Sequence, residues 1–165
     1  MKQRIIVSFL IAFLIVVGGL ITIYFTSTNK LTSEKKAAIE RAYQEADIKT
    51  VNRVDWFHYN EDYYILEGIN QDDESIIVWV PVAKNEEVFS ELKSEGLTED
   101  EAISLLYQGI KDLSDDKRPK QLINIKFGMV EGNPAYEITY RDQKNRYSIF
   151  LVDFYNGDWY RVYNL

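Results

Sequence analysis

The start of the chain is an uninterrupted apolar run. From Ile5 to Phe25 there are 21 residues without a charge, and a helix rising about 1.5 Å per residue would extend about 31 Å over them. That length covers the hydrocarbon core of a bilayer. Lys2 and Arg4 precede the run, and the next basic residue is Lys30. Because basic residues favour the cytoplasmic side, the pattern predicts a single-pass cell-membrane anchor with a cytoplasmic N-terminus and an extracytoplasmic C-terminal part.

A cleaved secretory signal is the alternative interpretation of this run. Signal peptides carry about 7 to 15 apolar residues before a cleavage site with small residues. Here the run is longer and continues into Thr26-Ser27-Thr28-Asn29. We therefore expect an uncleaved anchor, followed by a short connection from Thr26 to Leu31 that keeps the folded part close to the membrane.

After the anchor, helical and strand patterns follow each other. Apolar residues at helical spacing predict a helix over Ser33 to Ala46, with Ile39, Ala42, Tyr43 and Ala46 on one face. Period-two patterns bounded by turn residues predict strands over 51–59, 63–69 and 75–82. The last of these is apolar on both faces, which is typical of a strand covered on both sides. A short helix is expected over Glu87 to Ser94, with Gly96 as its stop.

The order of a helix followed by strands then recurs in the second half of the chain. Thr98-Glu99-Asp100-Glu101 has the spacing of a capping box, in which Thr98 and Glu101 each bind the other's backbone amide. A second helix should start there, with an apolar stripe of Ala102, Ile103, Leu106, Tyr107, Ile110 and Leu113. Strands are expected over 122–130, 135–141, 147–154 and 159–163, with turns at Asn133-Pro134, at 142–146 and at Asn156-Gly157.

The two halves resemble each other at a shift of 72 residues. The shift places Tyr64, Leu66, Ile77, Val78 and Val80 on Tyr136, Ile138, Ile149, Phe150 and Val152. Each half reads as a helix followed by antiparallel strands, which predicts an α+β fold of two tandem helix-on-sheet units after the transmembrane helix. We place the cytoplasmic tip and anchor at residues 1–28, the first unit at 29–95 and the second at 96–165.

The net charge and the absence of cysteine exclude several classes of partner and site. The chain has 26 acidic and 19 basic residues, a net charge of −7. Without Lys2 and Arg4 the exterior part is more acidic still, so nucleic acid is not expected as a partner. Because there is no cysteine, disulfides, thiolate metal sites and lipid attachment through cysteine are excluded.

The residues do not suggest an enzyme. His58, the only histidine, lies in the β-like stretch Trp56-Phe57-His58-Tyr59. No G-x-S-x-G nucleophile motif accompanies it, and one histidine without cysteine cannot hold zinc. The acidic clusters lack the pattern of a calcium loop, and the glycines are isolated at turns. We expect no catalytic residues, no cofactor and no metal. A pair of carboxylates for glycoside hydrolysis remains open among the 26 acids.

Aromatic residues are abundant outside the apolar run, with 19 Phe, Trp and Tyr side chains. Tyrosine and tryptophan are enriched at the centres of protein interfaces. Near the C-terminus several aromatics alternate around one hairpin, so some must point outward. If a partner-binding surface exists, we expect it at Tyr155, Trp159, Tyr160 and Tyr163. The alternative is that they fill the core and form cross-strand pairs.

Taken together, these motifs resemble the TseB-like (YpmB) family of Gram-positive bacteria. The resemblance rests on the anchor and helix, on Tyr63-Tyr64-Ile65, on Val78-Trp79-Val80-Pro81, on the segment from Gly96 to Ala102, on Tyr136-Glu137-Ile138-Thr139-Tyr140, and on the segment from Tyr147 to Phe154. It covers nearly the whole chain, and it is the order and spacing of the motifs that are specific.

This resemblance implies two small cystatin-like or PepSY-like domains. It also implies a non-catalytic regulator of cell-wall (peptidoglycan) elongation that binds a membrane-anchored peptidoglycan synthase, a class B penicillin-binding protein. An alternative suggested by PepSY-like domains is an inhibitor or chaperone of an extracellular peptidase. The resemblance assigns no residue to partner contact.

Overall fold

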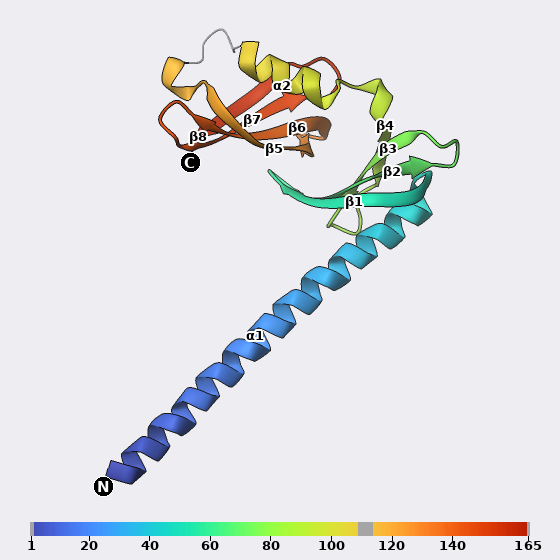
Figure 1. Ribbon diagram of the computed structural model, residues 1–165. Coiled ribbons are helices and arrows are strands. Elements are labelled where there is room, and N and C mark those ends of the chain that lie inside the picture. The colour runs from blue at the N-terminus through green and yellow to red at the C-terminus, as the bar shows by residue number, and fades with distance from the viewer. Residues whose placement is uncertain (1, 109–113, 165) are drawn as a thin grey trace. The chain divides into compact units, whose positions relative to one another are not determined.

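The computed structural model describes residues 2–108 and 114–164, without the side chains of residues 2–12, 21, 23–30 and 164. The chain divides into two compact parts, one up to Ala37 and one from Ala38 onward, and the sheets of both predicted units lie in the second part. Figure 1 shows a helix followed by two sheets. Both sheets have four antiparallel strands in chain order, so the predicted α+β class is confirmed.

Helix α1 runs without a break from Lys2 to Glu45. The short connection predicted from Thr26 to Leu31 is itself helical, so the apolar run and the helix predicted from Ser33 form one element. The segment contains neither Gly nor Pro, and Ser, Thr and Asn each cost a helix only up to about 0.7 kcal/mol. A helix begun in the apolar run therefore continues through them.

The predicted membrane span from Ile5 to Phe25 falls largely on residues whose side chains lie outside the described set. Among the described residues, no helix combines the length and the apolar character needed to cross a membrane. The anchor therefore stays a prediction from the sequence.

The first sheet follows α1 directly. It consists of β1 (Ile48–His58), β2 (Asp62–Asn70), β3 (Ser75–Pro81) and β4 (Phe89–Leu92). The last turns of α1 place Ala38 and Ala42 against one face of this sheet, where the buried side chains are Ile48, Tyr64, Leu66, Ile76, Val78 and Val80. The small alanines let the helix lie close to the strands, which gives the predicted helix-on-sheet arrangement.

The short helix predicted over Glu87 to Ser94 is wrong. Phe89 to Leu92 form β4, paired with β3 from Ile76 to Trp79, and only Lys93–Glu95 make a 3₁₀ turn, η1. Gly96 follows η1 as its C-cap, but with an extended backbone and not with the left-handed conformation for which glycine is usually needed there. A Cβ atom at Gly96 would collide with the Phe154 ring, so close packing explains this glycine.

The second unit begins with α2 (Glu99–Gln108). The predicted capping box is confirmed, because the Thr98 amide donates to Glu101 Oε2 at 2.8 Å and the Glu101 amide to Thr98 Oγ1 at 3.2 Å. Ala102 and Leu106 of the apolar stripe are buried, whereas Ile110 and Leu113 lie outside the described residues.

The second sheet consists of β5 (Pro119–Val130), β6 (Asn133–Asp142), β7 (Tyr147–Asp153) and β8 (Trp159–Asn164), after a 3₁₀ turn, η2 (Asp115–Lys117). We predicted the β5–β6 turn at Asn133-Pro134, but it lies at Glu131-Gly132. Both of these residues have positive φ, 52° and 79°, as a two-residue type I′ hairpin requires.

The 72-residue repeat extends to strand register. Tyr64 pairs with Val80 and Leu66 with Val78, while Tyr136 pairs with Val152 and Ile138 with Phe150. The first strand of each sheet carries two register shifts, between Ile48 and Thr50 and between Val51 and Arg53 in β1, and at positions 71 residues later in β5. The repeat is therefore a structural duplication, which apolar spacing alone could only indicate.

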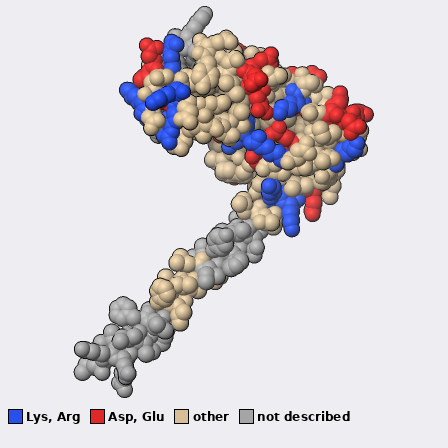
Figure 2. All heavy atoms as spheres, in the orientation of Figure 1, with Lys and Arg blue, Asp and Glu red and all other residues tan. Residues whose placement is uncertain are grey.

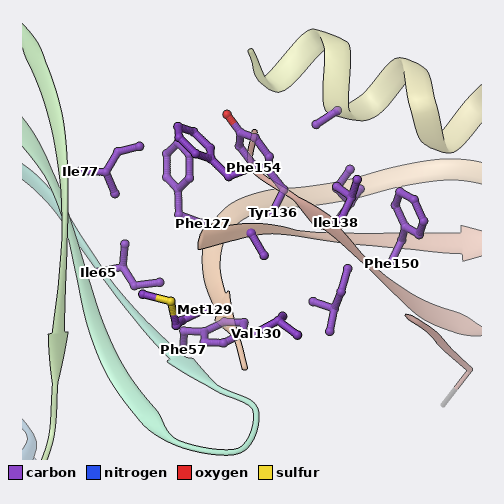
Figure 3. Packing of buried hydrophobic residues seen from close by; sticks show 14 of the residues in the cluster. Phe57, Ile65, Ile77, Phe127, Met129, Val130, Tyr136, Ile138, Phe150 and Phe154 are labelled. Atoms are coloured by element: carbon purple, nitrogen blue, oxygen red, sulfur yellow. The ribbon is translucent and has the colours of Figure 1, made fainter. Parts of the chain in front are cut away.

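The second face of the first sheet packs on the second unit. Trp79, fully buried, donates its indole N–H to the Gly128 carbonyl at 2.8 Å. Figure 3 shows Ile65 and Ile77 of the first sheet directed toward Phe127 and Met129 of β5. This arrangement explains why β3 is apolar on both faces, since α1 covers one face and the second unit the other.

Candidate functional site

The four aromatic residues predicted to bind a partner lie along the β7–β8 connection and β8. Tyr155 and Trp159 are exposed, by 42% and 49%, and Tyr160 and Tyr163 are half-buried. Among the described residues, no ring contact joins any two of the four. The structure therefore places them on one hairpin without making one stacked cluster of them.

Two of these aromatic residues donate a hydrogen bond from their hydroxyl to a carboxylate of the same chain. Tyr160 donates to Asp153 Oδ2 at 2.6 Å, and burial followed by this hydrogen bond raises the pKa of Tyr160. Tyr155 donates to Glu91 Oε2 at 2.9 Å, and burial, with the Glu91 bond next, raises the pKa of Tyr155 to about 12. Since Glu91 belongs to β4, Tyr155 links the β7–β8 connection to the first sheet.

The β7–β8 connection is held by side-chain caps. Asp153 Oδ1 accepts the amides of Tyr155 and Asn156 at 2.8 and 3.0 Å. Of the predicted Asn156-Gly157 pair, only Gly157 has a positive φ, 76°. The connection covers residues 154–158 and is longer than a two-residue turn, because β7 ends at Asp153.

Tyr163 belongs to the face of the second sheet that is turned away from α2. Its ring meets Tyr59 edge-on, with centroids 6.4 Å apart, and the neighbouring Tyr163 side chain raises the pKa of Tyr59. On the same strand and face, the Arg161 guanidinium lies 5.6 Å from the Tyr163 ring centroid. Tyr163 therefore lies between an aromatic ring, that of Tyr59, and a cation, the Arg161 guanidinium.

A second arginine on this face was missed in the sequence. Arg141 lies 3.6 Å above the Tyr147 ring, and the two residues are cross-strand neighbours in β6 and β7. Tyr147 is 45% exposed. Their positions on either side of the predicted turn over 142–146 were the available signal, since residues that flank a hairpin turn face each other.

His58 ends β1 with an exposed ring. Its Nδ1 atom lies 2.7 Å from Asp62 Oδ1, and the ring stacks on Trp56 at 5.8 Å. Both contacts fit the interpretation of a solvated strand histidine. Across the parts of the chain with described side chains, no three His, Asp or Glu residues form a group that could hold a metal.

A hollow of about 300 Å³ lies between the β1–β2 and β5–β6 turns. Its polar lining includes Glu61, Tyr63 and Glu131. The Tyr63 hydroxyl donates to Glu61 Oε2 at 2.7 Å, and burial followed by this bond raises the Tyr63 pKa. The Glu61 carboxylate thus helps to fix the turn at this end.

Comparison with known proteins identifies the family. A family model described as the cell wall elongation regulator TseB-like domain matches residues 37–81. A relative from Bacillus subtilis (strain 168), named "Probable cell wall elongation regulator TseB", is 32% identical over 152 residues, which cover 92% of this chain and 89% of the relative. Among solved structures, the YpmB protein from Bacillus subtilis is similar with a TM-score of 0.70 and 25% identity, over 79% of this chain and 96% of that chain. The chain therefore belongs to the TseB-like family of cell wall elongation regulators, as its motifs indicated.

Proposed function

We propose that this protein is a membrane-anchored, non-catalytic regulator of cell-wall elongation that acts by binding a class B penicillin-binding protein. The observation that carries the proposal is the 32% identity to the Bacillus subtilis relative over 92% of the chain. The name of that relative states a regulatory role. Membrane anchoring, the absence of catalysis and the identity of the partner are our extension of it.

Anchoring is supported by the uncharged run from Ile5 to Phe25 and by the basic residues before it. A hydrophobic run of this length is typical of a membrane-spanning helix. Confinement to one membrane raises the effective concentration of the folded part for any partner anchored there, so a modest affinity is enough for binding.

A binding role is supported by the way the aromatics are used. Many form the core, among them Trp79, Phe127 and Phe154, while Trp56, Tyr147 and Trp159 stay about half exposed. Exposed aromatics on a rigid sheet offer large contact areas at a small cost in side-chain entropy. Of the four residues predicted from the sequence, Tyr155 and Trp159 have the accessible rings.

Anchoring is tested by fractionating cells that produce the full chain. The protein should stay with the membranes after washing with salt and alkaline carbonate. A variant carrying Leu14→Asp and Val16→Asp should be released by the same wash, because charged residues at the centre of a span are strongly unfavourable. Release of the unaltered chain would contradict the anchor.

Partner binding is tested by chemical crosslinking in living cells and purification of the full chain. Fluorescent penicillin then labels any penicillin-binding protein in the purified adducts. We expect one labelled adduct, identified as a class B enzyme by mass spectrometry. If adducts of other membrane proteins form and none carries the label, the proposed partner is wrong.

A further inference from the structure

The second sheet has one face that α2 does not cover. Cross-strand pairing places Thr139 beside Ile149 and Ile149 beside Tyr163, and it places Arg141 beside Tyr147 and Leu151 beside Arg161. Directly opposed residues share a face. The surface made by Thr139, Arg141, Tyr147, Ile149, Arg161 and Tyr163 is called the outer face below.

Among the described residues, the end of β1 and the β1–β2 turn cover part of the outer face, where Tyr59 meets the Tyr163 ring and Trp56 approaches Lys126. Lys126 forms an ion pair with Glu137 at 3.0 Å and donates to the Trp56 carbonyl at 3.3 Å. Leu151 is buried in this part. Tyr147 and Arg161 are exposed, and the other residues of the outer face are half-buried. A sheet face of mixed aromatic and cationic residues is thus open to a partner.

The two arginines of the outer face differ in their partners from the other arginines that the structure describes. Arg41, Arg53, Arg118 and Arg146 each form an ion pair with a carboxylate. In the part of the chain with described side chains, neither Arg141 nor Arg161 forms an ion pair with a carboxylate. Each lies on a tyrosine of its own face instead, Arg141 on Tyr147 and Arg161 on Tyr163. The Tyr163 hydroxyl raises the pKa of Arg161, and Glu131 adds to this effect only at longer range.

These tyrosines hold the guanidinium groups in place. The central guanidinium carbon of Arg141 lies 3.6 Å from the Tyr147 ring centroid, and Arg141 also donates to the Asn145 carbonyl at 2.8 Å. Arg161 donates to the Tyr163 hydroxyl at 3.3 Å. A guanidinium that is already ordered loses less conformational entropy when it binds a carboxylate, and its planar fork suits bidentate contact.

The surroundings add positive charge to an otherwise acidic protein. Near the turn that joins β6 and β7 and the start of β5, five basic residues stand against three acidic ones: Lys117, Arg118, Lys120, Lys144 and Arg146 against Asp115, Asp116 and Asp142. Figure 2 shows Lys and Arg side chains gathered at one end of the folded part. The chain as a whole carries −7, so this local excess is opposite in sign to the molecule.

We infer that the outer face binds an acidic segment of the partner protein, with carboxylates placed against Arg141 and Arg161. Charge complementarity selects this occupant, because neither guanidinium forms an ion pair with a carboxylate among the described side chains. Strand spacing puts their Cα atoms roughly 15 Å apart, so a segment of about five extended residues spans them. The inference rests on the proposed function, and it adds the surface and the chemistry of recognition.

Photocrosslinking in living cells tests the surface. A photoreactive phenylalanine analogue replaces Tyr147 on the outer face or, as a matched control, Tyr107 on α2, which is 50% exposed against 45% for Tyr147. We expect a penicillin-labelled adduct from position 147 and none from 107. An adduct from position 107 alone would overturn the outer face while the proposed function stands. No labelled adduct from either position, together with none from general crosslinking, would count against the proposed function itself.

Charge reversal tests the chemistry. The variant with Arg141→Glu and Arg161→Glu should bind the purified synthase at least about tenfold more weakly, and the affinity of the unaltered chain should fall with added salt. The control with Lys35→Glu and Lys84→Glu makes the same change in net charge at exposed positions elsewhere and should lose less than about twofold. Unchanged melting temperatures show that all variants fold.

Three results would overturn this inference. One is equal weakening by both pairs of substitutions, which would mean that only net charge matters. Another is an adduct from position 147 between two copies of this chain with none to the synthase, which would make the outer face a self-association surface. The third is a loss of binding to vesicles of anionic phospholipid without any loss of binding to the synthase, which would assign the arginines to lipid headgroups.

Discussion

Arg146 binds the buried carboxylate of Asp142 twice, since its backbone amide donates to Oδ1 at 2.8 Å and its guanidinium to Oδ2 at 2.6 Å. The turn between β6 and β7 is built on this carboxylate, which also accepts the Lys144 amide. Asn70 occupies the equivalent position between β2 and β3, where its Oδ1 atom accepts the amides of Asp72 and Glu74. Asp73 and Asn145, also 72 residues apart, both have positive φ. The two units therefore share one turn design with different charges.

Asp142 should make the stability of the protein sensitive to acid. Burial alone would raise its pKa, but the amide and guanidinium of Arg146 outweigh this effect and lower it. A carboxyl whose folded pKa is depressed stabilises the fold above its unfolded pKa, about 3.9, and loses that contribution as pH falls through the folded value. Asp142→Asn should lower the unfolding free energy at neutral pH, and the difference from the unaltered chain should shrink below about pH 4.

Urea titrations at a series of pH values measure this difference. Asp72→Asn is the control, because Asp72 is an exposed residue of the equivalent turn in the first sheet. It should leave the unfolding free energy nearly unchanged at every pH. A constant gap between Asp142→Asn and the unaltered chain down to strong acid would show that the Asp142 charge is not responsible.

The shared turn design can be tested by exchanging its charges. Asn70 is buried and donates its side-chain amide to Glu74 Oε2 at 3.1 Å. Asn70→Asp replaces this bond by two facing carboxylates and should cost about 1–3 kcal/mol of unfolding free energy. Adding Glu74→Arg recreates the Asp–Arg pair of the second unit and should restore much of the loss. A double-mutant cycle measures the coupling, and strictly additive effects would contradict the equivalence of the turns.

Features that depend on local spacing could be predicted from the sequence. Thr98 and Glu101 form the expected capping box because both partners lie within one helical turn. The repeat could be recognised because Tyr64 and Tyr136 occupy equivalent positions in the pattern of apolar residues. This pattern determines which face of each strand is directed toward the core. In both cases the sequence interval between the residues determines the contact.

Features that depend on pairing between distant segments could not be predicted. Phe89 to Leu92 are only four residues in an acidic neighbourhood, and their pairing with β3 makes them a strand. At the candidate site, aromatic content pointed to Tyr155 and Trp159. The open arginines were missed because their lack of ion pairs among the described side chains becomes visible only when every ion pair is known. The continuation of the helix through Thr26 was not predicted, because the polar residues there gave no apolar stripe, although polar residues alone do not end a helix.

Tyr155 should make the fold sensitive to alkali. Its pKa is raised to about 12, first by burial and then by the bond to Glu91, whereas an unfolded tyrosine ionises near pH 10. An acid whose folded pKa is raised stabilises the fold below the unfolded pKa, and this contribution is lost as pH rises from about 10 to 12. Tyr155→Phe should therefore differ most from the unaltered chain below pH 10 and converge with it near pH 12. Unfolding free energies across this range measure the convergence, with the exposed Tyr107→Phe as control. Parallel curves for the Tyr155→Phe variant and the unaltered chain would contradict it.

Among the residues packed between the two sheets, Trp79 should be the one whose substitution lowers the unfolding free energy most. Its indole N–H is the donor to the buried Gly128 carbonyl, and the Phe57 ring packs closely on Gly128, since a Cβ atom there would lie 2.6 Å from that ring. Trp79→Phe keeps an aromatic ring but leaves the carbonyl unsatisfied, which should cost about 1–3 kcal/mol in addition to the lost packing. Trp159→Phe makes the same substitution at an exposed site and should change the unfolding free energy by less than about 0.5 kcal/mol. Denaturant titrations of both variants measure the difference, and equal losses at the two positions would show that the Trp79 hydrogen bond does not stabilise the packing between the two sheets.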